Sequence, residues 1–246
     1  MGRLFRLTVL LAGVLAAGCG PVGPEVRLSP DALSWRPASV AMLPAIASGN
    51  VVPSGGTLPA GEVRPTAGDA LNIVSSALAG SFRDRSEVKV VPLLFSSTQA
   101  GMRAETASRQ YLDARAVDPL VAVRLGTDTG SDAILLTAVL RYGPEVEDIQ
   151  QVNQNANTKL GTNQVNISST ASRAVLYYNI QYRCALVRCA DGAILWDASI
   201  RKREKHLAIL NVTQDSVLRS AIGEVVDTFP YARPRPEPIG GGPGGK

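Results

Sequence analysis

Two apolar strands joined by a short turn place the strongest constraint on the fold of this chain. Residues 173–189 and 193–202 both have the pattern of strands, and Ala190, Asp191 and Gly192 lie between them. These three residues suit a type I turn in which Gly192 adopts the left-handed conformation and forms a G1 bulge. Pairing Cys189 with Ala193 then sets the register of the hairpin.

That register predicts which side chains meet across the hairpin. Leu186 is expected opposite Trp196, Cys184 opposite Ala198, and Tyr182 opposite Ile200. Because successive side chains of a strand point to opposite faces, one face gathers the large apolar residues. We expect this core face to consist of Tyr182, Cys184, Leu186, Ile194, Trp196 and Ile200.

The rest of the chain alternates between strand and helix patterns. Hydrophobic periodicity predicts further strands at 39–45, 87–92 and 133–142, and helices at 66–85, 96–115, 118–126 and 213–228. Thr66 and Asp69 form a potential capping box, and Asp118 precedes a proline suited to a first helical turn. Gly126 is expected to end that helix.

This order of elements predicts the fold class. Helices interleaved with strands, together with one hairpin, indicate an α/β (α+β) domain with a single mixed sheet of about 4–5 strands and helices packed on it. The domain is expected over residues 38–230, with a polar insertion at 143–172 that holds many Asn and Gln residues and no aromatic residue. The Pro/Gly-rich tail, 231–246, is expected to be disordered.

The N-terminus has the features of a secretory signal. Arg3 and Arg6 precede an apolar run at 7–15, and small residues follow, up to Gly18 and Cys19. The run is too short to span a bilayer as a helix. Residues 1–18 are therefore expected to be removed, and the proline-containing segment 19–37 to act as an extended tether.

The sequence Ala16-Ala17-Gly18-Cys19 resembles the lipobox of bacterial lipoproteins. This resemblance implies cleavage between Gly18 and Cys19 and lipid modification of Cys19. No Asp follows the cysteine, which in lipoprotein sorting implies an outer-membrane location facing the periplasm. The alternative is an ordinary signal peptide with a structural cysteine nearby.

Charge and composition restrict the classes of partner. Removal of residues 1–18 takes away Arg3 and Arg6, so the formal charge falls from +4 to +2. No basic block is large enough to indicate nucleic-acid binding. The densest basic run, 201–205, is interpreted as a solvated strand end, with peptidoglycan or anionic lipid as the alternative contact.

The residues that carry catalysis are sparse. His206 is the only histidine, and Cys184 and Cys189 are about 16 Å apart along one strand, too far for a disulfide. Neither a phosphate-binding loop nor a G-x-S-x-G elbow is present. An acidic group at Glu145, Glu147 and Asp148 is interpreted as a solvated loop edge, with a cation or acid/base site as the alternative. We expect no catalytic residue, no metal and no cofactor.

Several motifs occur in an order that resembles a known group. The motifs are VAMLP (Val40–Pro44), TGSDAILL (Thr129–Leu136), CADGAILW (Cys189–Trp196) and TFP (Thr228–Pro230). With the lipobox, they resemble periplasmic lipoproteins that share the fold of the TolB N-terminal domain. That group includes the curli-secretion-channel lipoprotein and the activators of penicillin-binding proteins, and the likeness is greatest to its uncharacterised members.

The resemblance implies a non-enzymatic, lipid-anchored adaptor or accessory subunit of an envelope assembly, secretion or peptidoglycan-synthesis machine. Its partners would be the membrane, through the lipid, and another envelope protein or further copies of the chain; peptidoglycan contact is also open. The alternatives are a subunit of an oligomeric outer-membrane secretion channel and, more remotely, an envelope hydrolase that uses the acidic group.

Overall fold

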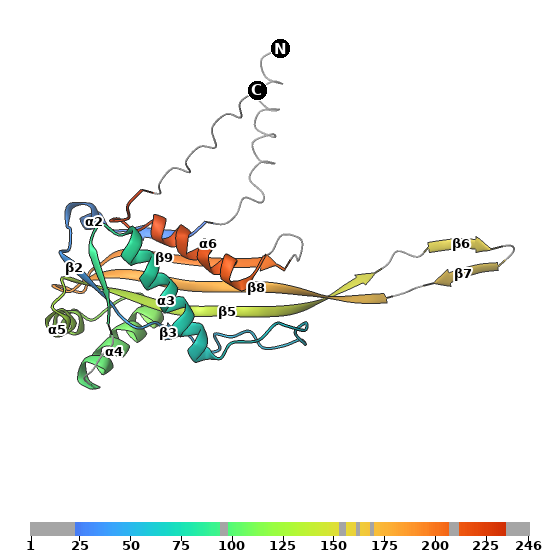
Figure 1. Ribbon diagram of the computed structural model, residues 1–246, viewed down its shortest axis with the longest axis horizontal. Helices are drawn as coiled ribbons and strands as arrows, with labels where there is room; N and C mark the ends of the chain where they lie inside the picture. Colours follow the sequence, from blue (N-terminus) through green and yellow to red (C-terminus); the bar gives the residue numbers. More distant parts are fainter. Residues whose placement is uncertain are drawn as a thin grey trace, which may run out of the picture.

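Helices pack on both faces of one mixed β-sheet (Figure 1). The computed structural model describes residues 23–93, 98–152, 156–160, 163–167, 170–206 and 212–234. The strands of the main sheet are β1 (Glu25–Leu28), β2 (Ser39–Met42), β3 (Ile46–Ala47), β4 (Lys89–Pro92), β5 (Ala133–Val152), β8 (Thr170–Arg188) and β9 (Ile194–Lys205). The helices are α2 (Asp31–Ser34), α3 (Ala67–Arg85), α4 (Thr98–Ala114), α5 (Pro119–Thr129) and α6 (Gln214–Asp227).

The sheet combines a parallel half with an antiparallel half. Its order is β1-β9-β8-β5-β2-β4, and β3 pairs with β5. Strands β4, β2 and β5 are parallel, whereas β5, β8, β9 and β1 are antiparallel. The expected α+β class with one mixed sheet is confirmed, but the described part of the chain contains a sheet of seven strands rather than four or five. The extra strand β3 has only two residues, and none of the four residues of β1 is buried, so neither strand has an alternating pattern in the sequence.

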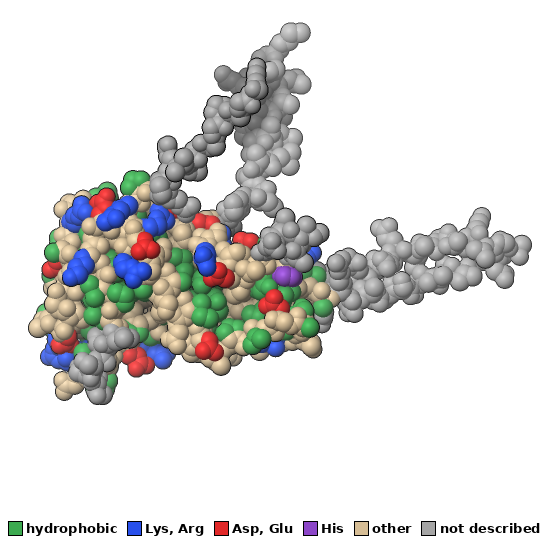
Figure 2. Space-filling model, viewed as in Figure 1, with side chains coloured by type: hydrophobic (Ala, Val, Ile, Leu, Met, Phe, Trp, Pro, Cys, Tyr) green, Lys and Arg blue, Asp and Glu red, His purple; other side chains and the backbone are tan. Residues whose placement is uncertain are grey.

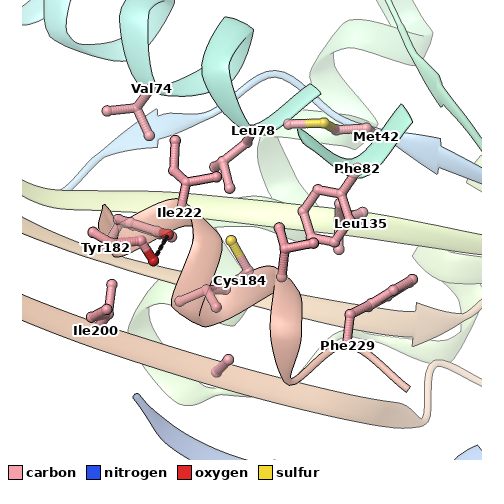
Figure 3. Packing of buried hydrophobic residues seen from close by; sticks show 14 of the residues in the cluster. Met42, Val74, Leu78, Phe82, Leu135, Tyr182, Cys184, Ile200, Ile222 and Phe229 are labelled. Carbon is pink, nitrogen blue, oxygen red and sulfur yellow. Dashed lines mark hydrogen bonds between the residues drawn. The ribbon is translucent and has the colours of Figure 1, made fainter. Parts of the chain in front are cut away.

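Alternate residues of the sheet face two separate cores. Ala133 and Leu135 of β5 face α3 and α6, whereas Ile134 and Leu136 face α4 and α5. Figure 3 shows the first core, where Val74, Leu78 and Phe82 of α3 and Ile222 of α6 meet the sheet. The hydroxyl of Tyr182 donates a hydrogen bond to the carbonyl of Ala221, 3.1 Å away, and so joins the sheet to α6.

The predicted hairpin is confirmed in its register. Leu186 lies opposite Trp196, Cys184 opposite Ala198, and Tyr182 opposite Ile200. Gly192 has φ of +73°, as the turn requires. The predicted pairing next to the turn is wrong: Arg188, rather than Cys189, donates its backbone N–H to the carbonyl of Ala193 across 2.9 Å, and Val187 lies opposite Ile194. The register shifts between Leu186 and Val187, and this shift moves Ile194 to the core under α4 and α5.

The predicted starts of α3 and α5 are confirmed, and one predicted end is wrong. Thr66 and Asp69 form the capping box of α3, and Asp118 caps α5 through the backbone N–H of Leu120. Helix α5 does not end at Gly126. It ends at Gly130 in the left-handed conformation, and Gly126 lies inside the helix where it passes close to Cys189.

The expected tether is wrong for residues 25–37. Strand β1 pairs with β9, and Ala32 of α2 is fully buried in the first core. The expected tail also begins too early, because Tyr231 is buried and Ala232 forms a β-bridge with Ser86. Both segments are ordered because they pair or pack with residues far away in the sequence, and the local composition of each segment does not show such contacts.

The expected polar insertion, 143–172, consists largely of strands in the part that the structure describes. Strand β5 continues to Val152 and β8 begins at Thr170, and the two pair throughout. Beyond them, β6 (Ala156–Leu160) pairs with β7 (Asn163–Ile167). Backbone pairing between β5 and β8 forms this ladder, so an apolar pattern is not required for it.

Candidate interaction surface

A two-stranded ribbon extends from one end of the body (Figure 1). It consists of Glu145–Val152 of β5 paired with Thr170–Tyr177 of β8. Strand β9 stops opposite Tyr177, so within the described residues the ribbon has no third strand. The ribbon therefore presents both of its edges within the part of the chain that the structure describes.

Charged side chains tie the base of the ribbon to the body. Arg141 and Asn179 both contact the carboxylate of Glu145, with Asn179 Nδ2 donating across 2.8 Å. Arg203 of β9 forms ion pairs with Glu145 at 3.7 Å and with Glu147 at 2.5 Å. The guanidinium of Arg203 also lies over the ring of Tyr177, 3.9 Å from the ring centroid.

The acidic group predicted from the sequence is thus partly explained. Glu145 and Glu147 are neutralised by Arg203, which is the arrangement of a structural charge network. The side chain of Asp148 lies outside the described residues. Arg203 belongs to the basic run 201–205, so the sequence contained both halves of this network, and the pairing of β5, β8 and β9 brings them together.

A loop between β3 and α3 supports the same end of the sheet. The backbone N–H of Tyr142 donates to the carbonyl of Val51 across 2.9 Å, and Arg64 donates to the carbonyls of Gly55 and Gly56. Gly56 lies so close to β5 that a Cβ atom there would be 2.6 Å from Cβ of Val146. This loop holds the point where the ribbon leaves the body.

His206 lies at this base and takes part in a hydrogen-bonded cluster. The hydroxyl of Tyr178 donates to Glu62 across 2.6 Å, and Nδ1 of His206 lies 3.1 Å from that hydroxyl and 3.2 Å from the carbonyl of Val212. An Nδ1–H that donates to Val212 satisfies this geometry. The cluster links the supporting loop, β8 and the start of α6, and its described members include no serine or cysteine.

The two cysteines of the domain are unsuited to nucleophilic chemistry. Both are free and buried. Burial raises the pKa of the Cys184 thiol to about 12 and that of the Cys189 thiol to about 12. Both thiols are therefore protonated at neutral pH, and the thiolate is the reactive form. Cys184 is the small core residue that the sequence predicted.

Other candidate sites contribute little chemistry. Within the described ranges no three His, Cys, Asp or Glu side chains come close enough to hold a metal ion, and no helix combines the length and apolarity needed to cross a bilayer. A groove of about 810 Å³ beside α4 and the start of α5 is an open surface hollow. Gly18 and Cys19 lie outside the described residues, so the predicted cleavage and lipidation remain expectations.

No family model and no curated protein matches the sequence. Among solved structures, the chain is similar to the PelC dodecamer from Paraburkholderia phytofirmans, with 12% identity, coverage of 86% of this chain and 98% of that chain, and a TM-score of 0.45. It is also similar to lipoprotein GNA1162 from Neisseria meningitidis, with 18% identity, coverage of 77% of this chain and 96% of that chain, and a TM-score of 0.39. A third similar structure is the LpoB C-terminal domain from Salmonella enterica, with 12% identity, coverage of 80% of this chain and 94% of that chain, and a TM-score of 0.27. No sequence family supports the grouping with envelope lipoproteins that the motifs suggested.

Proposed function

We propose that this protein is a non-enzymatic accessory protein of the cell envelope, anchored by lipid on Cys19 to the outer membrane and facing the periplasm. The observation that carries the proposal is the ribbon, a long strand pair that is tied to the body at its base and has no third strand beyond it among the described residues. Such open edges can accept a strand or loop of a partner. The resemblance of residues 16–19 to a lipobox supports an envelope location, and the buried thiols and paired carboxylates favour binding over catalysis.

The ribbon can be removed without disturbing the cores, because the register shows where to cut. Asp148 lies opposite Ala174, so replacing 149–173 by an Asn-Gly turn rejoins two facing residues. A matched variant replaces only 153–169 and rejoins Val152 to Thr170, which retains the ribbon. Both variants keep Cys19 and both hydrophobic cores.

The test compares complexes extracted from membranes in mild detergent, with their mass and composition measured. We expect the full-length protein to co-purify with a different envelope protein. The variant that lacks 149–173 should remain membrane-attached and folded but alone. If the variant that lacks 149–173 still captures the partner as well as the full-length protein does, the ribbon is not the binding element. If the variant that lacks only 153–169 also fails to capture the partner, the contact lies at the end of the ribbon.

One observation favours the alternative of an oligomeric secretion-channel subunit. Strand β1 covers β9 only from Trp196 to Ser199, so the outer edge of β9 from Ile200 to Lys205 has no strand partner among the described residues. The part of β5 that belongs to the ribbon, Glu145–Val152, likewise has no strand partner on the edge opposite β8 among the described residues. Two open edges on opposite sides of one sheet permit head-to-tail association of identical copies. Detergent-stable oligomers of this chain alone would favour that function over the adaptor.

A further inference from the structure

The N-terminal segment is an integral part of the domain and leaves little free chain before it. Strand β1 pairs with β9 from Glu25 to Leu28, and the backbone N–H of Ser29 donates to Leu195 across 2.9 Å. The hydroxyl of Tyr231 lies 3.1 Å from the carbonyl of Ala32 and 2.6 Å from that of Trp35, which fastens α2 beside the end of α6. Figure 1 shows β1 and α2, in blue, along one edge of the body.

The short connection to Cys19 limits how far this edge can be from the bilayer. Cys19 and Glu25 are six positions apart. A fully extended chain spans at most about 3.5 Å per residue, so the lipidated cysteine and the start of β1 are within about 20 Å of each other. A domain held this closely cannot reach far into the periplasm, and the edge that carries β1 must lie beside the membrane.

This same edge exposes apolar side chains. Val26 and Leu28 lie opposite Ala198 and Trp196, so they point to the face of the sheet that carries α3 and α6, yet Leu28 is 45% exposed. Leu33 of α2 is 77% exposed although its neighbour Ala32 is buried. Val26, Leu28 and Leu33 are thus exposed apolar side chains on the segment nearest to the proposed anchor, and we call these three residues the apolar strip.

The charged residues on the segment that carries the strip form ion pairs within it and with neighbouring elements. Arg27 pairs with Glu25 at 3.5 Å, Arg36 with Glu87 at 2.9 Å, and Arg188 with Asp31 at 3.1 Å. Figure 2 shows basic and acidic side chains intermingled on the visible face at the end of the body near α2. The strip therefore offers apolar contact with little net charge, which suits the interfacial region of a bilayer of any headgroup charge.

We propose that the β1–α2 edge rests on the lipid bilayer, with Val26, Leu28 and Leu33 in its interfacial layer. This inference rests on the proposed lipid anchor at Cys19. Since β1 is antiparallel to β9, which pairs in turn with β8, the ribbon then extends along the membrane surface. A partner bound by the ribbon would accordingly be captured close to the membrane.

The test places an environment-sensitive fluorophore at Leu33 in the full-length, lipidated protein. L33C is compared with V63C and L120C, since Val63 is 78% exposed and lies in the loop that supports the ribbon, and Leu120 is 70% exposed on α5. Cys184 and Cys189 are buried and should not react with the label. The proteins are reconstituted into vesicles of phosphatidylethanolamine with or without phosphatidylglycerol, and quenching by nitroxide-labelled lipid is measured.

We expect the label at Leu33 to be quenched several-fold more than the labels at Val63 and Leu120, with or without phosphatidylglycerol. Flotation of the protein with the vesicles, and its loss in C19S, report the anchor separately. Flotation without preferential quenching at Leu33 would overturn the membrane contact while leaving the anchor intact. Absence of flotation would overturn both. Quenching that requires phosphatidylglycerol would assign the edge to cationic contact with anionic lipid and would also overturn the proposal. Shielding of the label at Leu33 in detergent that increases with protein concentration would assign the edge to contact with a second copy and would likewise overturn it.

Discussion

The hydroxyl of Tyr111 donates a 2.6 Å hydrogen bond to a carboxylate oxygen of Asp197, and both side chains are buried. Tyr111 belongs to α4 and Asp197 to β9, so this bond joins a helix to a strand across the second core. Arg115 lies 3.7 Å from the other carboxylate oxygen. The carboxylate is thereby compensated in a place where an unpaired charge would be costly.

Replacing Tyr111 by phenylalanine should destabilise the protein, because Asp197 loses its donor while remaining buried. A buried acceptor left without its partner costs about 1–3 kcal/mol. Urea unfolding followed by circular dichroism measures this loss. Tyr177, which is only partly buried, provides the matched tyrosine-to-phenylalanine control, and an equal effect in both variants would contradict the importance of the Asp197 bond.

Two glycines inside helices should respond in opposite ways to alanine. A Cβ at Gly126 would be 2.6 Å from Cβ of Cys189, so G126A must push α5 away from β8 at a cost of about 1–3 kcal/mol. A Cβ at Gly80 in α3 meets nothing within 4 Å, so G80A should stabilise the helix by about 0.5–1 kcal/mol. The urea midpoints of the two variants should therefore lie on opposite sides of the wild-type value, and a gain in stability for G126A would disprove the close approach.

Stability should fall in alkaline solution because of the buried thiols. The ordinary pKa of a cysteine is 9.0, whereas burial raises the pKa of both Cys184 and Cys189 to about 12. Between these values the unfolded chain has released protons that the folded chain retains, so stability declines as the pH rises. The contribution is complete below about pH 9 and is lost progressively toward about pH 12.

Unfolding free energies at about pH 8 and about pH 10 test this slope. The double variant C184A/C189A should show a smaller decline over that interval than the wild type, even though removal of the thiols lowers its stability at both values. Equal declines would mean that the thiols do not contribute and that other groups, such as the buried tyrosines, account for the alkaline loss.

Arg203 should stabilise the base of the ribbon. R203A removes two ion pairs and the contact with Tyr177, which together are expected to contribute about 1–2 kcal/mol in this partly exposed setting. Amide hydrogen exchange in 145–147 and 175–179 should accelerate. The neighbouring exposed residue Arg201 is the matched control, and R201A should change stability by less than about 0.5 kcal/mol.

Short-range features of the chain were predictable where neighbouring residues decide the structure. The capping box of Thr66 and Asp69 and the turn at Gly192 depend on a few consecutive residues, and both are confirmed. The predicted hairpin register is right from Leu186 and Trp196 onward, although the pairing of Cys189 with Ala193 from which it was derived is wrong. Ile194 was misplaced because the bulge at Leu186 and Val187 reverses the face of one residue, and nothing in the local alternation marks where a bulge falls.

Contacts between distant residues account for what the pattern missed. All four residues of β1 are exposed, so the strand has no periodic burial and exists only because β9 supplies its hydrogen bonds. The base of the ribbon is similar: Glu145 and Glu147 are far from Arg203 in sequence, and three adjacent strands bring them together. Gly126 was wrongly predicted to end a helix, because the constraint on it comes from Cys189, which is far away in sequence in the turn after β8.

The sequence by itself determined the helix starts, the central hairpin and its register, the mixed α+β class and the scarcity of catalytic groups, since these depend on local propensity, periodicity and residue type. Only the tertiary structure decided that the domain begins at β1, that the polar segment continues β5 and β8 as a ribbon, and that an apolar strip lies next to the proposed anchor. Those features arise from backbone hydrogen bonds and packing between segments far apart in the chain, and such pairings leave no signature in either segment alone.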